Sequence, residues 1–133
     1  TCIGAFCEPD ESVVITRDSD LICFDRVSMV AMPMGQKREF MLFHKRELLE
    51  HLELPSAHHL LLAAVVTSND YGKGLYRCGI KTNINHVRHL DLDLGSGELL
   101  QCIKTGVQEY IDSINRQSGT AFHADFSSAI EAF

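Results

Sequence analysis

The chain has 133 residues, of which 45% are hydrophobic and 23% charged, the composition of a soluble globular domain or a large part of one. Its longest apolar run, Leu60 to Val66, is far shorter than the roughly 18 to 20 residues that a membrane span needs, so we expect no membrane partner. The net charge of −6 argues against nucleic-acid binding over the whole surface. The chain begins without a Met or a signal peptide, and residues 1–7 are small and apolar, so we expect a fragment that starts at the end of a helix.

Three short apolar runs in the first half of the chain predict strands. The β-branched run Ser12 to Thr16 is typical of a buried parallel strand. Ser28 to Pro33 and Arg38 to His44 predict two more strands, which Gly35-Gln36 would join as a hairpin.

The rest of the chain predicts helices, beginning with one in Lys45 to Glu53. Three longer helices are expected over 55–67, 80–89 and 98–115, the last of these with a possible cap at Ser96. A final helix should start at Gly119-Thr120 and place four apolar side chains on one face, namely Phe122, Phe126, Ile130 and Phe133. Strands and helices therefore come first, followed by helices only, which indicates an α/β fold with an all-helical end.

The cysteine pattern indicates reduced thiols. There are five cysteines at irregular spacings, without a C-x-x-C pair, and most lie among apolar neighbours. His86 and His89 are three residues apart, but a second ligand pair at a spacing suited to zinc is missing. We expect these histidines, like His58 and His59, to contribute packing or phosphate contacts.

Two acids follow the first predicted strand at once, in the order Asp18, Ser19, Asp20. Ligands of open α/β sheets bind at the carboxyl ends of the strands. Two neighbouring carboxylates repel each other, and a hard divalent cation such as Mg²⁺ relieves that repulsion. The same short pattern also occurs as a solvated acidic turn, in glycosyltransferases and in phosphatases with an aspartate nucleophile. By itself it predicts only a candidate metal site.

A third acid, Asp70, comes after the apolar run Leu60 to Val66. We place it at the end of that helix, where the helix dipole disfavours an anion, so Asp70 either turns to solvent or meets a cation. Residues 71–90 contain no acid but carry four basic residues, Lys73, Arg77, Lys81 and Arg88. This basic window is the one part of an acidic chain that suits DNA phosphates, and it disfavours a sugar-nucleotide enzyme.

Three strings in this order resemble the flap endonuclease and exonuclease-1 family, which includes XPG-type nucleases. V-V-I-T-R-D-S-D-L-I-C-F-D (13–25) is similar to its internal nuclease motif, and L-L-L-A-A-V-V-T-S-N-D-Y (60–71) to its apolar helix ending in D-Y. G-L-Y-R-C-G-I-K-T-N (74–83) resembles the start of its helix–two-turn–helix DNA-binding element. The spacing of the strings also matches the family, and the match covers about residues 13 to 90.

The resemblance implies a fold, a site and a reaction. Residues 1–70 would be the C-terminal half of a PIN-like nuclease domain with a twisted, mostly parallel sheet, and 71–133 the helix–two-turn–helix region with further helices. The implied reaction is hydrolysis of phosphodiester bonds in DNA at flaps, junctions or ends by two Mg²⁺ ions, or Mn²⁺. Asp18, Asp20 and Asp70 would be catalytic metal ligands. The implied DNA-binding residues are Lys73, Arg77, Gly79, Lys81 and Arg88, with Lys81 near a helix N-terminus that holds a phosphate.

The chain departs from the family in the DNA-binding loop. Arg77 stands where the family has a glycine, Cys78 where it has an apolar residue, and Asn83 where it has a small one; only Gly79 is kept. The first glycine permits close backbone approach, so its loss weakens the expectation of the K⁺ ion that this loop holds through backbone carbonyls.

The family builds its site from more acids than these three, so the others would lie upstream of Thr1, and the fragment alone should be inactive. A different hypothesis is a non-catalytic nucleic-acid-binding or scaffold protein that kept the fold, which the altered loop and the acidic balance favour. Three retained buried acids would argue against it. A nuclear location is implied by the family alone, and no motif for binding a sliding clamp is present.

Overall fold

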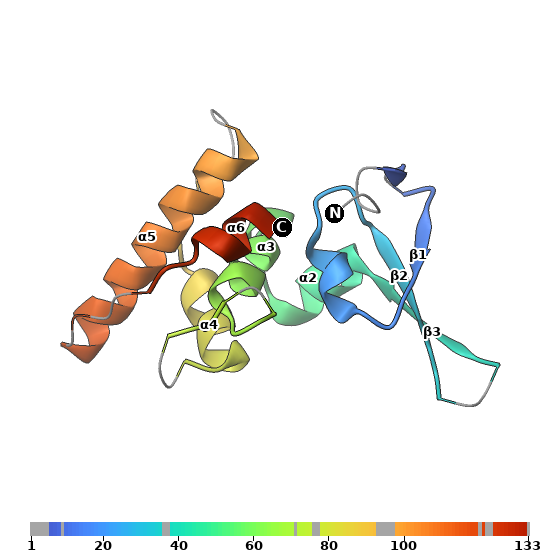
Figure 1. Cartoon of the computed structure of the whole chain (residues 1–133), viewed down its shortest axis with the longest axis horizontal. Coiled ribbons are helices and arrows are strands. Elements are labelled where there is room, and N and C mark those ends of the chain that lie inside the picture. The colour runs from blue at the N-terminus through green and yellow to red at the C-terminus, as the bar shows by residue number, and fades with distance from the viewer. Residues whose placement is uncertain are drawn as a thin grey trace. The chain divides into compact units, whose positions relative to one another are not determined.

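The structure is a computed structural model that describes residues 6–8, 10–35, 38–70, 72–75, 78–92, 98–119, 121 and 124–132. The chain divides into two compact units, Thr1–Glu53 and Leu54–Phe133 (Figure 1). Its described part is α/β, with a small mixed sheet in the first unit and helices in the second. The helix end expected over residues 1–7 lies largely outside the described residues, and the domain boundary expected at residue 70 stays a prediction.

The first unit contains a three-stranded sheet, within the described residues, in the order β1 (Val13–Ile15), β2 (Met29–Pro33) and β3 (Phe40–His44). β1 pairs parallel with β2, placing Val14 opposite Val30, as predicted for this strand. β2 and β3 form the predicted antiparallel hairpin, with Val30 opposite Phe43. The expectation of a mostly parallel sheet is wrong for these strands, because the hairpin makes half of the pairing antiparallel.

The two faces of this sheet differ. Val14 and Val30 are buried on one face, where the 3-10 helix η1 (Ser19–Cys23) contacts β2. Alternate residues along the strands point to the opposite face. There Val13 and Ile15 are 46% and 68% exposed, so the prediction of a buried first strand holds only for its central residue.

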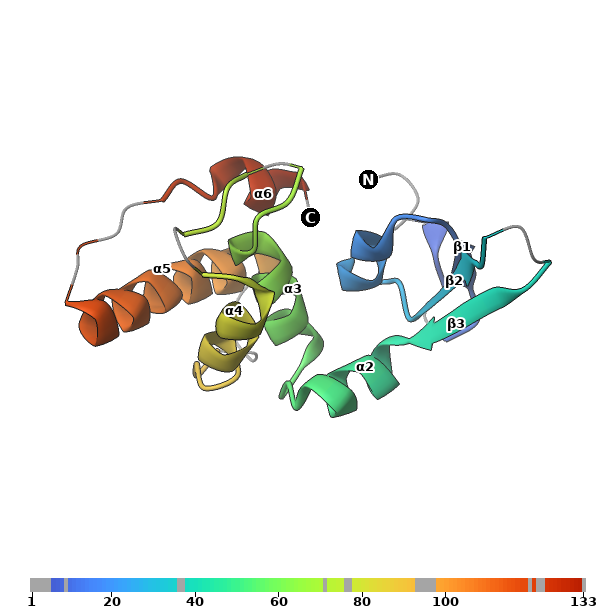
Figure 2. The ribbon, with the colours of Figure 1, turned by 90° about the horizontal axis from the view of Figure 1, so that it is seen from below.

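Helix α2 (Lys45–Leu52) continues directly from β3, as Figure 2 shows, and ends at Glu53 in the left-handed conformation. The Lys45 side chain is buried, and its Nζ donates to the carbonyl oxygens of Phe24 and Asp25 at 2.7 and 3.2 Å. Burial lowers the pKa of Lys45, because desolvation disfavours its charged form. The start of α2 is thereby attached to the segment that follows η1.

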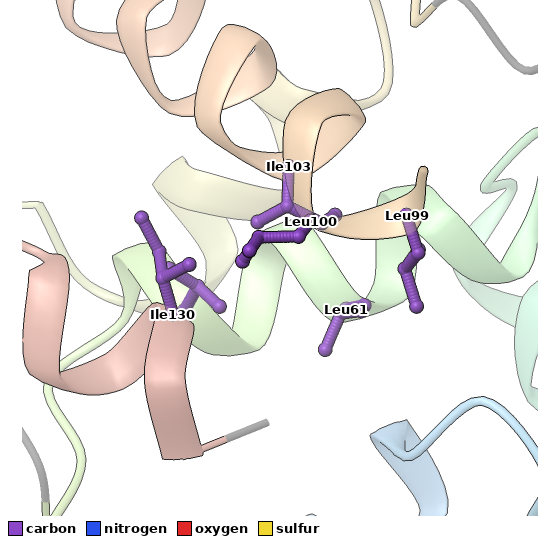
Figure 3. A pocket seen from close by; sticks show the side chains of 6 residues that line it. Leu61, Leu99, Leu100, Ile103 and Ile130 are labelled. Carbon is purple, nitrogen blue, oxygen red and sulfur yellow. The ribbon is translucent and has the colours of Figure 1, made fainter. Parts of the chain in front are cut away.

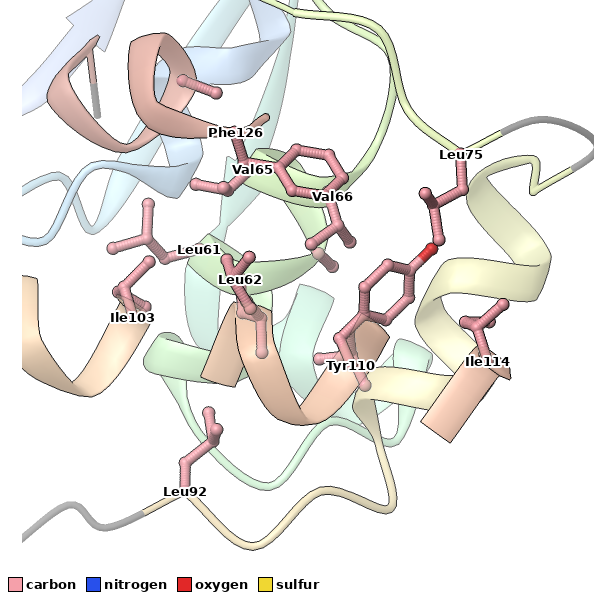
Figure 4. Close-up of a cluster of buried hydrophobic side chains, with 14 residues drawn as sticks. Leu61, Leu62, Val65, Val66, Leu75, Leu92, Ile103, Tyr110, Ile114 and Phe126 are labelled. Carbon is pink, nitrogen blue, oxygen red and sulfur yellow. The ribbon is translucent and has the colours of Figure 1, made fainter. Parts of the chain in front are cut away.

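The second unit has four helices in its described part: α3 (Ala57–Val66), α4 (Ile80–Val87), α5 (Leu99–Ser118) and α6 (Ser127–Ala132). α3 is apolar on nearly all sides and contacts each of the other three, as a helix at the centre of a core does. The buried cluster around it includes Leu62, Val66, Leu75, Tyr110 and Phe126 (Figure 4).

The helix predictions hold in type, but the last helix starts later than expected. α6 begins at Ser127, whose backbone N–H donates to Oδ1 of Asp125 at 2.9 Å. Asp125 therefore caps the start of the helix. Of the face expected on this helix, Phe126 is buried and Ile130 is partly buried. Ser96, Phe122 and Phe133 lie outside the described residues.

Candidate metal and nucleic-acid site

The two neighbouring acids follow the carboxyl end of β1, with Asp18 at the N-cap of η1 and Asp20 in its first turn. The backbone N–H of Asp18 donates to Thr16 Oγ1 at 3.0 Å. The carboxylate of Asp18 in turn accepts from the backbone N–H of Asp20 at 3.1 Å, so Asp18 is the N-cap of η1. Oδ1 of Asp18 thus caps η1. The carboxylate still has lone pairs that can accept another hydrogen bond or bind a cation.

The three candidate acids are more exposed to solvent than we expected for metal ligands. Asp18 and Asp70 are exposed and Asp20 is half-buried. Their presence therefore costs little desolvation energy, and a cation is not required to compensate for burial. The expectation of three buried acids is therefore wrong for Asp18 and Asp70, and these exposed acids do not count against a non-catalytic protein.

Asp70 lies in a tight turn and not at the end of a helix. α3 ends at Val66, and Asn69 holds the turn, because its N–H donates to the Gly72 carbonyl and its Oδ1 accepts from the Gly72 N–H, both at 3.0 Å. The Asn69 amide also donates to the carbonyl of Ala64 at 2.9 Å, capping α3. Asp70 is left exposed at the tip of this turn, four residues beyond Val66.

The donor chemistry of these acids suits Mg²⁺, which prefers carboxylate oxygen and water. Asp18 and Asp20 belong to the first unit and Asp70 to the second. Among the residues that the structure describes, no group of three or more His, Cys, Asp or Glu side chains is placed to hold a metal ion. A metal site that contains all three acids stays a prediction.

The basic window is spread along the loop before α4 and along that helix. Lys73 is exposed in the loop, Gly79 is the N-cap of α4, and exposed Lys81 lies in the first turn, as predicted. Arg88 is half-buried at the C-cap, seven residues beyond Lys81, a rise of about 10 Å along the helix. Arg77 lies outside the described residues.

Asn83 is a buried side chain whose role the sequence reasoning missed. It is 0% exposed. Its side chain makes hydrogen bonds with the Tyr110 hydroxyl and with the Thr67 hydroxyl just beyond α3. The signal that could have found it is its spacing of four residues from Val87, which is also 0% exposed, because such residues share one face of a helix.

The histidines have packing roles where the structure describes their contacts. His59 is buried, with Nδ1 2.8 Å from Ser56 Oγ and Nε2 3.1 Å from the carbonyl oxygen of Leu90. The ring of His86 meets that of Tyr110 edge-on, with 6.3 Å between centroids. Burial, and secondarily the nearby His89, lowers the pKa of His86, so it is a weaker base than an exposed histidine.

An apolar groove of about 250 Å³ lies among α3, α5 and α6. Leu61, Leu99, Leu100, Ile103 and Ile130 point into it from these helices (Figure 3), and Val65 completes the lining. This lining offers no ionisable or nucleophilic group, so the groove supplies no chemistry for bond cleavage.

Comparison of the chain with models of known protein families gave no match, and comparison with curated proteins also gave none. The family resemblance therefore rests on the three strings themselves. None of the helices in the described ranges is long and apolar enough to cross a membrane.

Proposed function

We propose that this chain is part of a metal-dependent, structure-specific DNA nuclease of the flap endonuclease type, with a PIN-like fold. The observation that carries the proposal is the position of Asp18 and Asp20, directly beyond the carboxyl end of a strand that pairs in parallel. This edge of a sheet is where α/β proteins bind ligands, and adjacent carboxylates there suit a divalent cation. Asp70 would be a further ligand contributed by the turn after α3.

The start of α4 supports DNA as the substrate. The first N–H groups of a helix have no partner within the helix and attract anions. Exposed Lys81 lies in that first turn, Gly79 precedes it, and exposed Lys73 belongs to the loop before it. The proposal assigns a backbone phosphate of duplex DNA to this end of α4, with Arg77 and Arg88 as further contacts.

Bound Mg²⁺ or Mn²⁺ ions would activate water and stabilise the leaving oxygen in phosphodiester hydrolysis. On this proposal, Asp18, Asp20 and Asp70 serve as ligands, and additional acids come from the protein upstream of Thr1. A role in DNA replication or repair and a nuclear location belong to the same proposal. The isolated chain should bind DNA but not cleave it.

The experiment is cleavage of a labelled 5′-flap substrate by the full-length protein that contains this chain, with and without Mg²⁺. Asp18→Asn, Asp20→Asn and Asp70→Asn should each reduce the rate at least about 100-fold, as loss of a catalytic group does. Asp10→Asn and Asp91→Asn are matched controls, since both are exposed acids outside the proposed site. Full cleavage by all three site variants would contradict the proposal.

A second candidate is a non-catalytic nucleic-acid-binding or scaffold protein that kept the nuclease fold. The capping role of Asp18 and the exposure of Asp18 and Asp70 favour it, because such residues can be retained without a metal. It predicts flap-DNA binding that is insensitive to Mg²⁺, with no cleavage by the full-length protein. The same assay therefore separates the two candidates.

A further inference from the structure

Asn83 lies at a junction of three helices and makes hydrogen bonds with both ends of its amide group. Its Nδ2 is 3.0 Å from Thr67 Oγ1, 3.4 Å from the carbonyl oxygen of Val66 and 3.5 Å from that of Cys78. Its Oδ1 accepts from the Tyr110 hydroxyl at 2.6 Å. The Asn83 side chain is fully buried, and its bonds to Tyr110 and Val66 are buried, while those to Thr67 and Cys78 are partly buried.

The chemistry of the neighbours fixes which way the Asn83 amide points. Two of the three atoms around Nδ2 are backbone carbonyl oxygens, which only accept, so the NH₂ group must face them. The Thr67 hydroxyl donates its own proton to the Ala63 carbonyl at 2.7 Å, which leaves its lone pairs to accept from Asn83. Proton donation therefore runs in one direction, from Tyr110 through Asn83 and Thr67 to Ala63.

The oxygens that Nδ2 contacts come from two separate segments. Val66 and Thr67 are at the end of α3, and Cys78 is in the loop just before α4. The loop also packs tightly on α3 at Gly74, where an added Cβ would lie 2.9 Å from the Val66 carbonyl oxygen. Oxygens brought together in such a largely buried place need a donor, a water molecule or a cation.

We infer that Asn83 holds Cys78, at the end of the loop before α4, onto the end of α3 in place of a monovalent cation, so that this junction forms without bound K⁺. The family resemblance implies a K⁺ held by carbonyls of this loop, and the described atoms do not fit one. The NH₂ group carries positive partial charge and already lies among the oxygens, so it would repel a cation there. This inference needs neither DNA nor a divalent metal and stands apart from the proposed nuclease activity.

The first test measures the thermal unfolding midpoint of the chain in KCl and in tetramethylammonium chloride at equal concentration. A cation site filled at a hundred times its dissociation constant would raise the midpoint by roughly 10 °C or more in KCl. We expect the two midpoints to agree within about 1 °C, since no site is available to fill. A clear stabilisation specific to K⁺ would overturn the inference.

The second test converts the donor into an acceptor. Asn83→Asp keeps the shape of the side chain but places a carboxylate oxygen where the NH₂ group faced the oxygens of Val66, Thr67 and Cys78. The unfolding midpoint should therefore fall, and it should recover in part when K⁺ replaces tetramethylammonium. Asn85→Asp is the matched control, because it adds the same charge at an exposed position of α4. An Asn83→Asp chain that folds but responds to K⁺ no more than the control would contradict the inference.

A third measurement applies even if Asn83→Asp does not fold. In the wild-type chain, the side-chain NH₂ protons of Asn83 should exchange with water at least about 100-fold more slowly than those of Asn85, because they are buried and hydrogen-bonded. Assignment of the side-chain NH₂ resonances by NMR separates the two groups, and Asn85→Asp confirms the control signal by its loss. Equal exchange rates would show that Asn83 does not hold the junction.

Discussion

The Tyr110 hydroxyl donates a hydrogen bond of 2.6 Å to Oδ1 of Asn83, and both side chains are 0% exposed. This bond joins α5 to α4 inside the core of the second unit. Burial raises the pKa of Tyr110 above its usual range, and the neighbouring Cys78 side chain adds to the shift.

Removing this hydroxyl should destabilise the chain. Tyr110→Phe leaves Oδ1 of Asn83 buried without its donor, so the free energy of unfolding should fall by about 1 to 3 kcal/mol. Urea unfolding followed by circular dichroism measures the change. A variant as stable as the wild type would mean that the bond contributes nothing net.

The same substitution should change how stability depends on pH. Because the pKa of Tyr110 is higher in the folded chain than the value of about 10 in the unfolded chain, the unfolded chain loses its proton first. The stability linked to the neutral phenol is therefore complete below about pH 10 and is lost as pH rises above it. The difference in stability between wild type and Tyr110→Phe should shrink above that pH, and urea midpoints from pH 8 to 11 test this.

Gly74 and Gly72 offer a matched pair in one loop. A Cβ at Gly74 would lie 2.9 Å from the Val66 carbonyl oxygen and 3.0 Å from the Ser68 nitrogen, which are backbone atoms that cannot easily move. Gly74→Ala should therefore cost about 1 to 3 kcal/mol of stability. A Cβ at Gly72 meets no described atom within 4 Å, so Gly72→Ala should change stability far less. Equal effects would contradict the close packing of this loop on α3.

Lys81 should contribute one ionic contact to DNA binding. If its ammonium group binds a phosphate, Lys81→Ala weakens binding for all sequences and reduces the slope of log affinity against log salt by about one. Lys104 is equally a surface lysine but lies on α5, so Lys104→Ala should leave that slope unchanged. Fluorescence anisotropy with a labelled flap duplex, over a series of KCl concentrations, supplies both slopes. Identical slopes for the two variants would remove Lys81 from the interface.

Cys23 should resist alkylation in the folded chain. Burial, and secondarily the charge of Asp20, raises the pKa of its thiol to about 12, so only about one thiol in 10⁴ is ionised at pH 8. Cys78 and Cys102 are half-buried and should react with iodoacetamide first. Mass spectrometry of digested protein gives the order of labelling, and the preference should disappear in denaturant. Early labelling of Cys23 in the folded chain would contradict its burial.

Local sequence signals were sufficient for the hairpin and for the helix types. Gly35 between two apolar runs predicts β2 and β3, and the apolar composition of 57–66 predicts a buried helix. The predicted helix end near residue 67 and the solvent alternative for Asp70 agree with the structure, but the turn that Asn69 forms was not predicted, because sequence periodicity does not reveal such a turn. The burial of Asn83 could be read from its spacing to Val87, but its bond to Tyr110, 27 residues away, leaves no local pattern.

The capping bond between the Asp18 carboxylate and the Asp20 N–H gives the first unit an internal reporter. A cation drawn to Asp18 must redistribute electron density on the oxygen that accepts this bond. The amide resonance of Asp20 would then shift during a titration with Mg²⁺, before any substrate is present. If Asp18 binds Mg²⁺ as proposed, one backbone proton would therefore report that binding directly.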